Sequence, residues 1–198
     1  MINKIKLIIF LSTIFVANAF GSDAQIIDAI AKDKADVVIG FLNKGLDVNK
    51  IISGETLLAK AAKNNALCVA ELLISKGAMV ENIKPIDIQV SALSWGITKN
   101  NLLMTYLLLS RGATPKFVEL LETLDVNEDF LKLLIEFGGD VNQRDFDLNA
   151  TLKEILSNRS PERVEIIDNA EEIKKEGKLK QKLEKDLEEE LKKRCKQK

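Results

Sequence analysis

Aliphatic side chains recur along this chain in short runs, and each run ends at a glycine. Four runs end at Gly45, Gly77, Gly112 and Gly138. The positions four and eight residues before each glycine are apolar in every copy, and such positions share one helical face. A glycine can take the left-handed conformation that closes a last helical turn. The pattern therefore predicts four helices, whose apolar positions are Phe41, Leu73, Leu108, Leu134, Val37, Val69, Met104 and Phe130.

A second helix is expected before each of these runs. In the second and third copies it begins after Thr56 and Ser91, which are good N-cap residues. In the first copy the corresponding segment is 24–30. Residues 46–49 and 139–142, which follow two of the glycines, contain Asp-Val-Asn and suit a turn-forming link to the next unit. The chain therefore predicts helix pairs whose closing glycines are 32, 35 and 26 residues apart.

This succession of helix, turn, helix, glycine and Asp-Val-Asn resembles the ankyrin repeat over about residues 22–158. The Pro-Leu-His of that family is missing from the first helices, where Leu57-Leu58-Ala59 and Ala92-Leu93-Ser94 stand. The fourth copy is short, so its hairpin finger is expected to be absent. Residues 82–90 are expected to form an irregular finger, and residues 149–156 a capping helix.

The resemblance implies an all-α fold, an ankyrin-repeat solenoid of helical hairpins with short β-turn fingers, followed by a charged C-terminal helix. We expect a signal peptide at 1–19, a repeat domain of about four units and a capping helix at 20–158, and a charged helical or coiled-coil-like tail at 159–198. Leu72, Leu107 and Leu133 are expected to pack between neighbouring units.

The N-terminus has the pattern of an export signal. Lys4 and Lys6 precede an apolar run at 7–16, and Ala17-Asn18-Ala19 fits a signal peptidase site. We expect cleavage before Phe20 and a periplasmic or secreted protein. The alternatives are a membrane anchor formed by residues 7–16, although a spanning helix needs about twenty residues, and a buried first helix.

Composition argues against catalysis. The chain has no histidine, and its formal net charge of −1 provides no basic field for nucleic acid. No phosphate-binding loop or zinc motif is present, so we expect no enzyme, no cofactor and no metal site. The acidic spacing from Asp125 to Glu136 imitates a calcium loop but has Phe130 where glycine is required. It is interpreted as a helix start capped by Asn127 or Asp125.

The two cysteines are far apart in the sequence. Cys68 is expected to be a free, buried, small apolar residue, and Cys195 lies in the tail, where an intermolecular disulfide is the alternative to a free thiol.

In the tail, acidic residues precede basic ones by four positions, and Leu179, Leu183, Leu187 and Leu191 recur every four residues. This spacing favours a solvated helix with ion pairs along it. A self-pairing coiled coil and a basic contact site are the alternatives.

Two functions are consistent with this organisation. The first is an exported protein-binding module with a protein partner, no nucleic acid, and no membrane contact after signal cleavage. The second is a structural or assembly protein that self-associates through its tail.

Trp95 is interpreted as packing, with a rim contact as the alternative. The resemblance places partner contacts at the finger tips and late in the first helices, at Ile52, Ser53, Glu55, Lys63, Asn64, Asp87, Ile88, Val90, Thr98 and Lys99; for Ile52, Ile88 and Val90 the alternative is covering the edge of the core.

Overall fold

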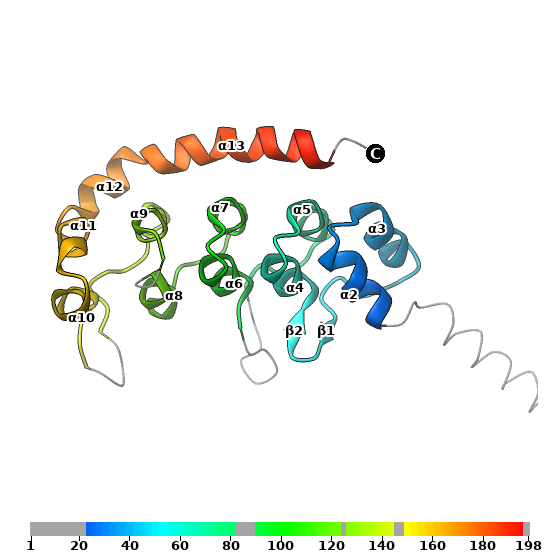
Figure 1. Cartoon of the computed structure of the whole chain (residues 1–198), viewed down its shortest axis with the longest axis horizontal. Coiled ribbons are helices and arrows are strands. Elements are labelled where there is room, and N and C mark those ends of the chain that lie inside the picture. The colour runs from blue at the N-terminus through cyan, green and yellow to red at the C-terminus, as the bar shows by residue number, and fades with distance from the viewer. Residues whose placement is uncertain (1–22, 82–89, 124–125, 145–148, 196–198) are drawn as a thin grey trace, which may run out of the picture.

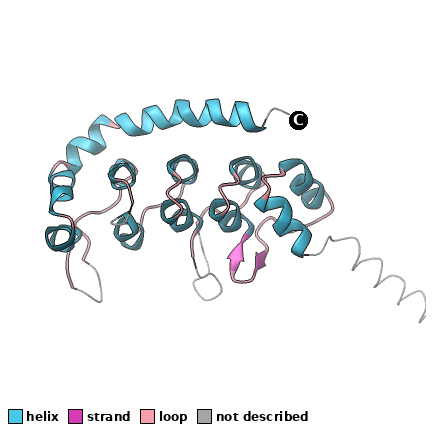
Figure 2. Ribbon diagram, viewed as in Figure 1, coloured by secondary structure: helices cyan, strands magenta, loops and turns pink. Residues whose placement is uncertain are grey.

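The protein is mostly helical, as expected, with one two-stranded sheet in its described part. The computed structural model describes residues 23–81, 90–123, 126–144 and 149–195 (Figure 1). The helices form two rows (Figure 2). The inner row contains α2 (Asp23–Ala31), α4 (Leu57–Lys63), α6 (Ala92–Thr98), α8 (Phe117–Glu122) and α10 (Leu152–Arg159), and the outer row contains α3 (Ala35–Asn43), α5 (Leu67–Ser75), α7 (Leu102–Ser110) and α9 (Glu128–Glu136).

Each of the first four inner helices is followed along the chain by its outer partner. In the first three pairs the connecting turn contains one left-handed residue, at Asp33, Asn65 or Asn100. Each outer helix then ends at a glycine, and the φ angles of the four glycines lie between 89° and 99°. These are the glycines that close the aliphatic runs, so the predicted helix stops are confirmed.

The predicted helix starts are also confirmed. The hydroxyls of Thr56 and Ser91 accept hydrogen bonds from backbone N–H groups in the first turns of α4 and α6. Asn127 caps α9 in the same way. The predicted capping helix is α10, where Thr151 and Glu154 form a capping box that satisfies two N-terminal donors.

One finger is described. Strands β1 (Ile51–Ile52) and β2 (Glu55–Thr56) pair antiparallel, and Ser53 and Gly54 make the turn with positive φ. Residues 82–89, where the irregular finger is expected, lie outside the described residues. Between α7 and α8, residues 111–116 are described and contain no strand, so the fourth copy has no finger there, as its short length predicts.

The apolar columns form one continuous core through the stack. Leu73, Leu108 and Leu134 are buried, and so are Val69, Met104 and Phe130. Leu107 and Leu133 are fully buried, and Leu72 packs against the same core. The first copy departs from this pattern.

In that first copy Val37 was expected in the core, but it is 40% exposed and Val38 is buried instead. Helix α3 belongs to the terminal pair and packs against α2 and α5, so its buried face is turned toward a single neighbouring unit.

Side chains of one unit bind backbone groups of the next. Asn49 Oδ1 accepts from the N–H of Met79, and Glu81 Oε1 accepts from the N–H of Thr114, both at 2.8 Å. Each acceptor lies four residues after a closing glycine, and each donor two residues after the following one. These equivalent bonds connect successive units at the same register, beside the shared apolar core.

The tail differs from the solvated helix that its spacing favours. After η2 (Pro161–Arg163), helices α11 (Val164–Asp168) and α12 (Ala170–Glu176) turn the chain, and α13 (Lys178–Cys195) runs back over α9, α7 and α5 (Figure 1). We call residues 161–195 the C-terminal strap. Leu183 and Leu187 are buried under α13, because a leucine at every fourth position still provides one face for docking.

Polar contacts fix the strap at two places, at its first residues and at the start of α13. Glu136 at the end of α9 accepts hydrogen bonds from the N–H groups of Leu179 (3.0 Å) and Lys180 (2.7 Å), which α13 leaves without helical partners. Arg163 donates to the carbonyls of Thr123 and Val126. These bonds connect the strap to the α8–α9 region.

A disulfide fixes the other end of the strap. Cys68 and Cys195 are joined within the chain, with their Cα atoms 5.5 Å apart. The predictions of a free Cys68 and of an intermolecular bond through Cys195 are therefore wrong. The sequence separation of 127 residues hid the pairing, because only the docking of α13 brings its last residue to α5.

The N-terminal segment 1–19, with its predicted signal peptide, lies outside the described residues. Among the helices of the described part, none is long and apolar enough to cross a membrane.

Candidate functional site

The strap divides the described surface into two faces. It lies over the outer helices α5, α7 and α9, whereas the inner row and the β1–β2 finger lie on the opposite side of the stack (Figure 1). The inner row therefore presents helix faces that α13 does not contact. We call the surface formed by α4, α6 and the finger the inner face.

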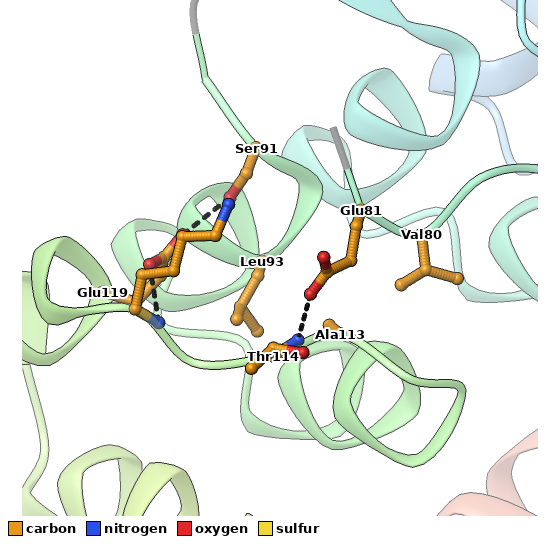
Figure 3. A pocket seen from close by; sticks show the side chains of 8 residues that line it. Val80, Glu81, Ser91, Leu93, Ala113, Thr114 and Glu119 are labelled. Atoms are coloured by element: carbon orange, nitrogen blue, oxygen red, sulfur yellow. Dashed lines mark hydrogen bonds between the residues drawn. The ribbon is translucent and has the colours of Figure 1, made fainter. Parts of the chain in front are cut away.

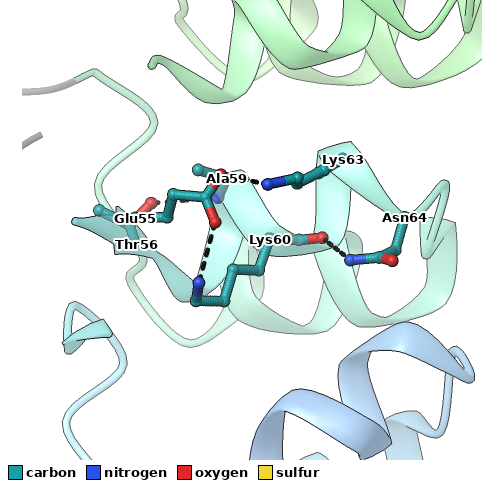
Figure 4. A network of polar contacts seen from close by, with 6 residues as sticks. All are labelled: Glu55, Thr56, Ala59, Lys60, Lys63 and Asn64. Atoms are coloured by element: carbon teal, nitrogen blue, oxygen red, sulfur yellow. Dashed lines mark hydrogen bonds and ion pairs between the residues drawn. The ribbon is translucent and has the colours of Figure 1, made fainter. Parts of the chain in front are cut away.

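A buried ion-pair network supports the finger on the inner face (Figure 4). Glu55, which is 8% exposed, accepts from Lys60 Nζ at 2.9 Å and from Lys63 Nζ at 3.0 Å. Burial alone would raise the pKa of Glu55, but the hydrogen bonds and charges of the two lysines hold it below its ordinary value. Because Glu55 lies in β2 and both lysines in α4, the network fixes the finger to its helix.

Trp95 lies between two lysines on the inner face. Lys63 Nζ is 4.4 Å from the centre of the indole ring, and Lys99 Nζ is 5.4 Å from it. Such ammonium–ring contacts are attractive because the ring face is electron-rich. Trp95 packs partly against the core, and its Nε1 is buried without a hydrogen-bond acceptor in the described part of the chain. The interpretation of Trp95 as packing thus agrees with the structure, whereas a rim contact stays a prediction.

The predicted contact residues are in different environments. Ser53, Lys63, Asn64, Thr98 and Lys99 are exposed, and they come from the finger turn and the ends of α4 and α6. Ile52 is buried, which fits the alternative that it covers the edge of the core.

Three further predicted positions belong to the expected finger of the third copy. Val90 is half-buried, and Asp87 and Ile88 lie outside the described residues. The structure therefore brings Lys63 and Lys99 together at Trp95, and Glu55 joins this group through its ion pair with Lys63.

Sequence reasoning missed the partner of Glu55 inside α4. Lys60 was not singled out, because a lysine within a helical run is usually solvated. Its place inside the apolar run 57–62 was the available signal, and its neighbours Ala59 and Ala61 are both buried.

Two carboxyl groups of α8, Glu119 and Glu122, were also missed. The Glu119 carboxylate accepts from the hydroxyls of Ser91 (3.2 Å) and Ser94 (3.3 Å). Burial raises the pKa of neighbouring Glu122 to about 7, the charge of Glu119 adds to this increase, and the nearby Ser94 hydroxyl opposes it. Glu122 is therefore partly protonated at neutral pH.

A small hollow lies beside Glu119 (Figure 3). Its volume is about 60 Å³, and it is bordered by Glu81, Ser91 and Thr114. Pockets for small molecules usually measure about 300–1,000 Å³. The polar groups around this hollow bind one another, as Glu81 does with the N–H of Thr114. The hollow is therefore part of the connection between units.

A larger acidic hollow of about 400 Å³ lies where α9 faces α11 and α12. Five glutamates and Lys132 line it, and Lys132 pairs with Glu128 at 2.6 Å. Within the described residues, no three histidine, cysteine or acidic side chains are placed to hold a metal ion. The glutamates of this hollow are Glu128, Glu162, Glu165, Glu172 and Glu176.

The fold and the inner face thus define a class: stacked helical hairpins with one face covered by the chain's own C-terminus. Comparison with known proteins adds no family, since no protein-family model and no curated protein matches the chain.

Proposed function

We propose that this chain is an exported, ankyrin-like solenoid that binds a protein partner through its inner face. The observation that carries the proposal is the division of the surface by the strap. The outer row is covered by α13, whereas α4, α6 and the finger have no such cover in the described part. Stacked helical hairpins commonly use their concave surface for binding.

Trp95 is the expected centre of this contact. Interface energy concentrates in a few residues, and tryptophan is enriched among them. Lys99 provides an exposed ammonium group beside the ring and forms no ion pair with an acidic side chain in the described region. These features favour a partner that brings carboxylates to the rim of an aromatic contact.

Export is supported by two independent features. The pattern at residues 1–19 is that of a signal peptide. The Cys68–Cys195 disulfide belongs to an oxidising compartment, because thiols in the cytosol are kept reduced. We place the mature protein in the periplasm or outside the cell. We propose no catalytic role, because the described side chains of the inner face are lysines, a tryptophan and a carboxylate already paired with two lysines, none of which is placed as a general base.

Self-association through the tail is the alternative function. The leucines that would pair two tails, Leu183 and Leu187, are buried against the chain's own outer helices. A coiled-coil partner would have to displace those contacts and break the disulfide. The binding module is therefore the better-supported proposal.

Site-specific photocrosslinking in living cells tests the proposal. A photoreactive residue placed at Lys99 on the inner face is expected to capture one discrete partner. The matched control is the same residue at Lys185, which is exposed on α13. Capture from Lys185 and none from Lys99 would show that the strap, and not the inner face, meets the partner.

A further inference from the structure

The disulfide lies beside an open hollow. Cys68, Glu71, Glu188, Leu191, Lys192 and Cys195 line this hollow, which measures about 320 Å³ and lies between α5 and α13. Cys68 is 7% exposed, whereas Cys195 is exposed in the last turn of α13. A reagent can therefore approach the Cys195 side of the bond without opening the repeat stack.

The end of helix α13 is held less firmly than the start of this helix. Near its start, Leu183 is buried and Glu136 binds two backbone N–H groups. Beyond Leu187, the only apolar side chain of α13 is Leu191, which is half-buried. The disulfide is thus the main attachment of the last two turns.

A buried acceptor atom without a donor lies at the same end. Glu71 Oε1 pairs with Arg111 at 2.6 Å, but Glu71 Oε2 is buried without a donor in the described part of the chain. Glu188 lines the same hollow, and its Oε2 atom lies 3.5 Å from Lys192 Nζ. Opening of the strap would hydrate Glu71 Oε2, and an unsatisfied buried acceptor is unfavourable.

We infer that the Cys68–Cys195 pair is a reversible modification site for dithiols, and that its reduction releases the C-terminal half of α13. This inference is independent of the partner-binding function proposed above. The substrate class is a dithiol, either a small molecule or a pair of cysteines on another protein.

The thiol–disulfide exchange between the dithiol and the cysteine pair has two steps. A thiolate of the dithiol attacks Cys195 Sγ, the S–S bond breaks, and Cys68 leaves as a thiolate that takes up a proton. The second thiol of the dithiol then attacks the mixed disulfide and releases Cys195 as a thiol. Two electrons pass from the dithiol, which leaves as a disulfide, to the cysteine pair.

Release exposes a new part of the outer row. The segment 188–195 leaves α5, so Cys68 and Glu71, which line the hollow from α5, gain solvent, while residues 178–183 stay bound to α9 and α7. The strap would open as a flap hinged near Leu183 and Leu187, and the repeat stack would stay folded.

The experiment treats the full-length oxidised protein with dithiothreitol and no denaturant. Alkylation followed by mass spectrometry measures the reduction of the pair, and hydrogen exchange measures the opening. We expect complete reduction, exchange in residues 188–195 and in α5 that accelerates at least tenfold more than exchange in residues 178–183, and an unchanged helical circular dichroism signal. The double variant Cys68→Ser with Cys195→Ser should show the same fast exchange without any reductant.

Three results would overturn the inference. The bond could resist dithiothreitol until the protein is denatured. The exchange of residues 188–195 could stay slow after complete reduction and in the double variant, which would show that Leu187 and Leu191 suffice to hold the helix. Exchange could also rise by the same factor in residues 188–195 and along the whole stack, which would make the bond a global staple with no local release.

Discussion

At the scale of single residues, two carboxyl groups meet where α8 packs against α6. Because its pKa is raised to about 7 from an ordinary 4.5, Glu122 holds its proton more strongly in the folded state than in the unfolded state. Folding then takes up protons between about pH 4.5 and 7, so this group's contribution makes stability fall as the pH rises through that window.

The variant Glu122→Gln tests this contribution. Its free energy of unfolding, measured by urea titration, should exceed that of the wild type at pH 8 and match it at pH 4. The difference should be on the order of 1 kcal/mol, because solvent screens part of the effect at this partly buried group. A difference that is constant over the whole range would show that Glu122 titrates normally.

Gly96 is a second residue with a defined role. A Cβ at this position would lie 2.8 Å from Thr105 Oγ1 and 3.3 Å from the backbone nitrogen of Thr105, where α6 and α7 approach most closely. Gly96→Ala should therefore lower the free energy of unfolding by about 1–3 kcal/mol, since overpacking forces the helices apart.

Gly40 is the matched control for that substitution. It also lies inside a helix, but a Cβ there meets nothing within 4 Å. Gly40→Ala should raise the free energy of unfolding by up to about 1 kcal/mol, because alanine favours the helix. Equal changes for the two variants in thermal melts would contradict the close approach at Gly96.

At the scale of elements, the disulfide restrains the unfolded chain across a long loop. Cys195→Ser should lower the free energy of unfolding by about 2–4 kcal/mol. Cys68→Ser should have a similar effect, and the double variant should add little, because each single change already removes the same bond. Additive losses in urea titrations would indicate that the two thiols act separately.

Deletion of the strap should have a larger effect. Truncation after Ser160 removes the disulfide together with Leu183 and Leu187, and full burial of each leucine contributes about 1.5–3 kcal/mol. The sequence alone suggested that the tail adds only weak helix pairs, since every apolar column lies upstream. A melting temperature unchanged by truncation would restore that interpretation.

The elements were predictable to the extent that their signals are local. The stopping glycines and the caps at Thr56 and Ser91 depend on neighbours within one or two turns, so the sequence displays them. The path of the strap is not local: four leucines at intervals of four are equally compatible with solvent, with another copy, and with the outer row. The Cys68–Cys195 pair depends on that path and was therefore missed.

The inner face was predictable only in part. The family resemblance indicated Lys63 and Lys99, because they lie at the ends of predicted first helices. It also indicated Glu55 as a surface contact, although two lysines bury and neutralise it. Reversal of the Glu55 charge would leave Lys60 unpaired inside the protein and destabilise the finger. Glu55 is therefore unsuitable as a position for testing partner binding, and the test needs an exposed residue of the inner face.

At the scale of the whole molecule, the described part of the chain has one face covered by its own C-terminus and an inner face that α13 leaves uncovered. The role proposed for this inner face is to bind a protein. Lys99 and Lys185 provide a matched pair for testing it, because both are exposed and neither forms an ion pair in the part of the chain that the structure describes.

The most direct measurement is the affinity of the crosslinked partner for Lys99→Glu and for Lys185→Glu, each compared with the wild type by titration calorimetry. Both variants change the charge by the same amount and should melt like the wild type. We expect at least tenfold weaker binding for Lys99→Glu, equivalent to about 1.4 kcal/mol, and unchanged binding for Lys185→Glu. Unchanged binding for Lys99→Glu together with weakened binding for Lys185→Glu would contradict the account and assign the partner to the strap.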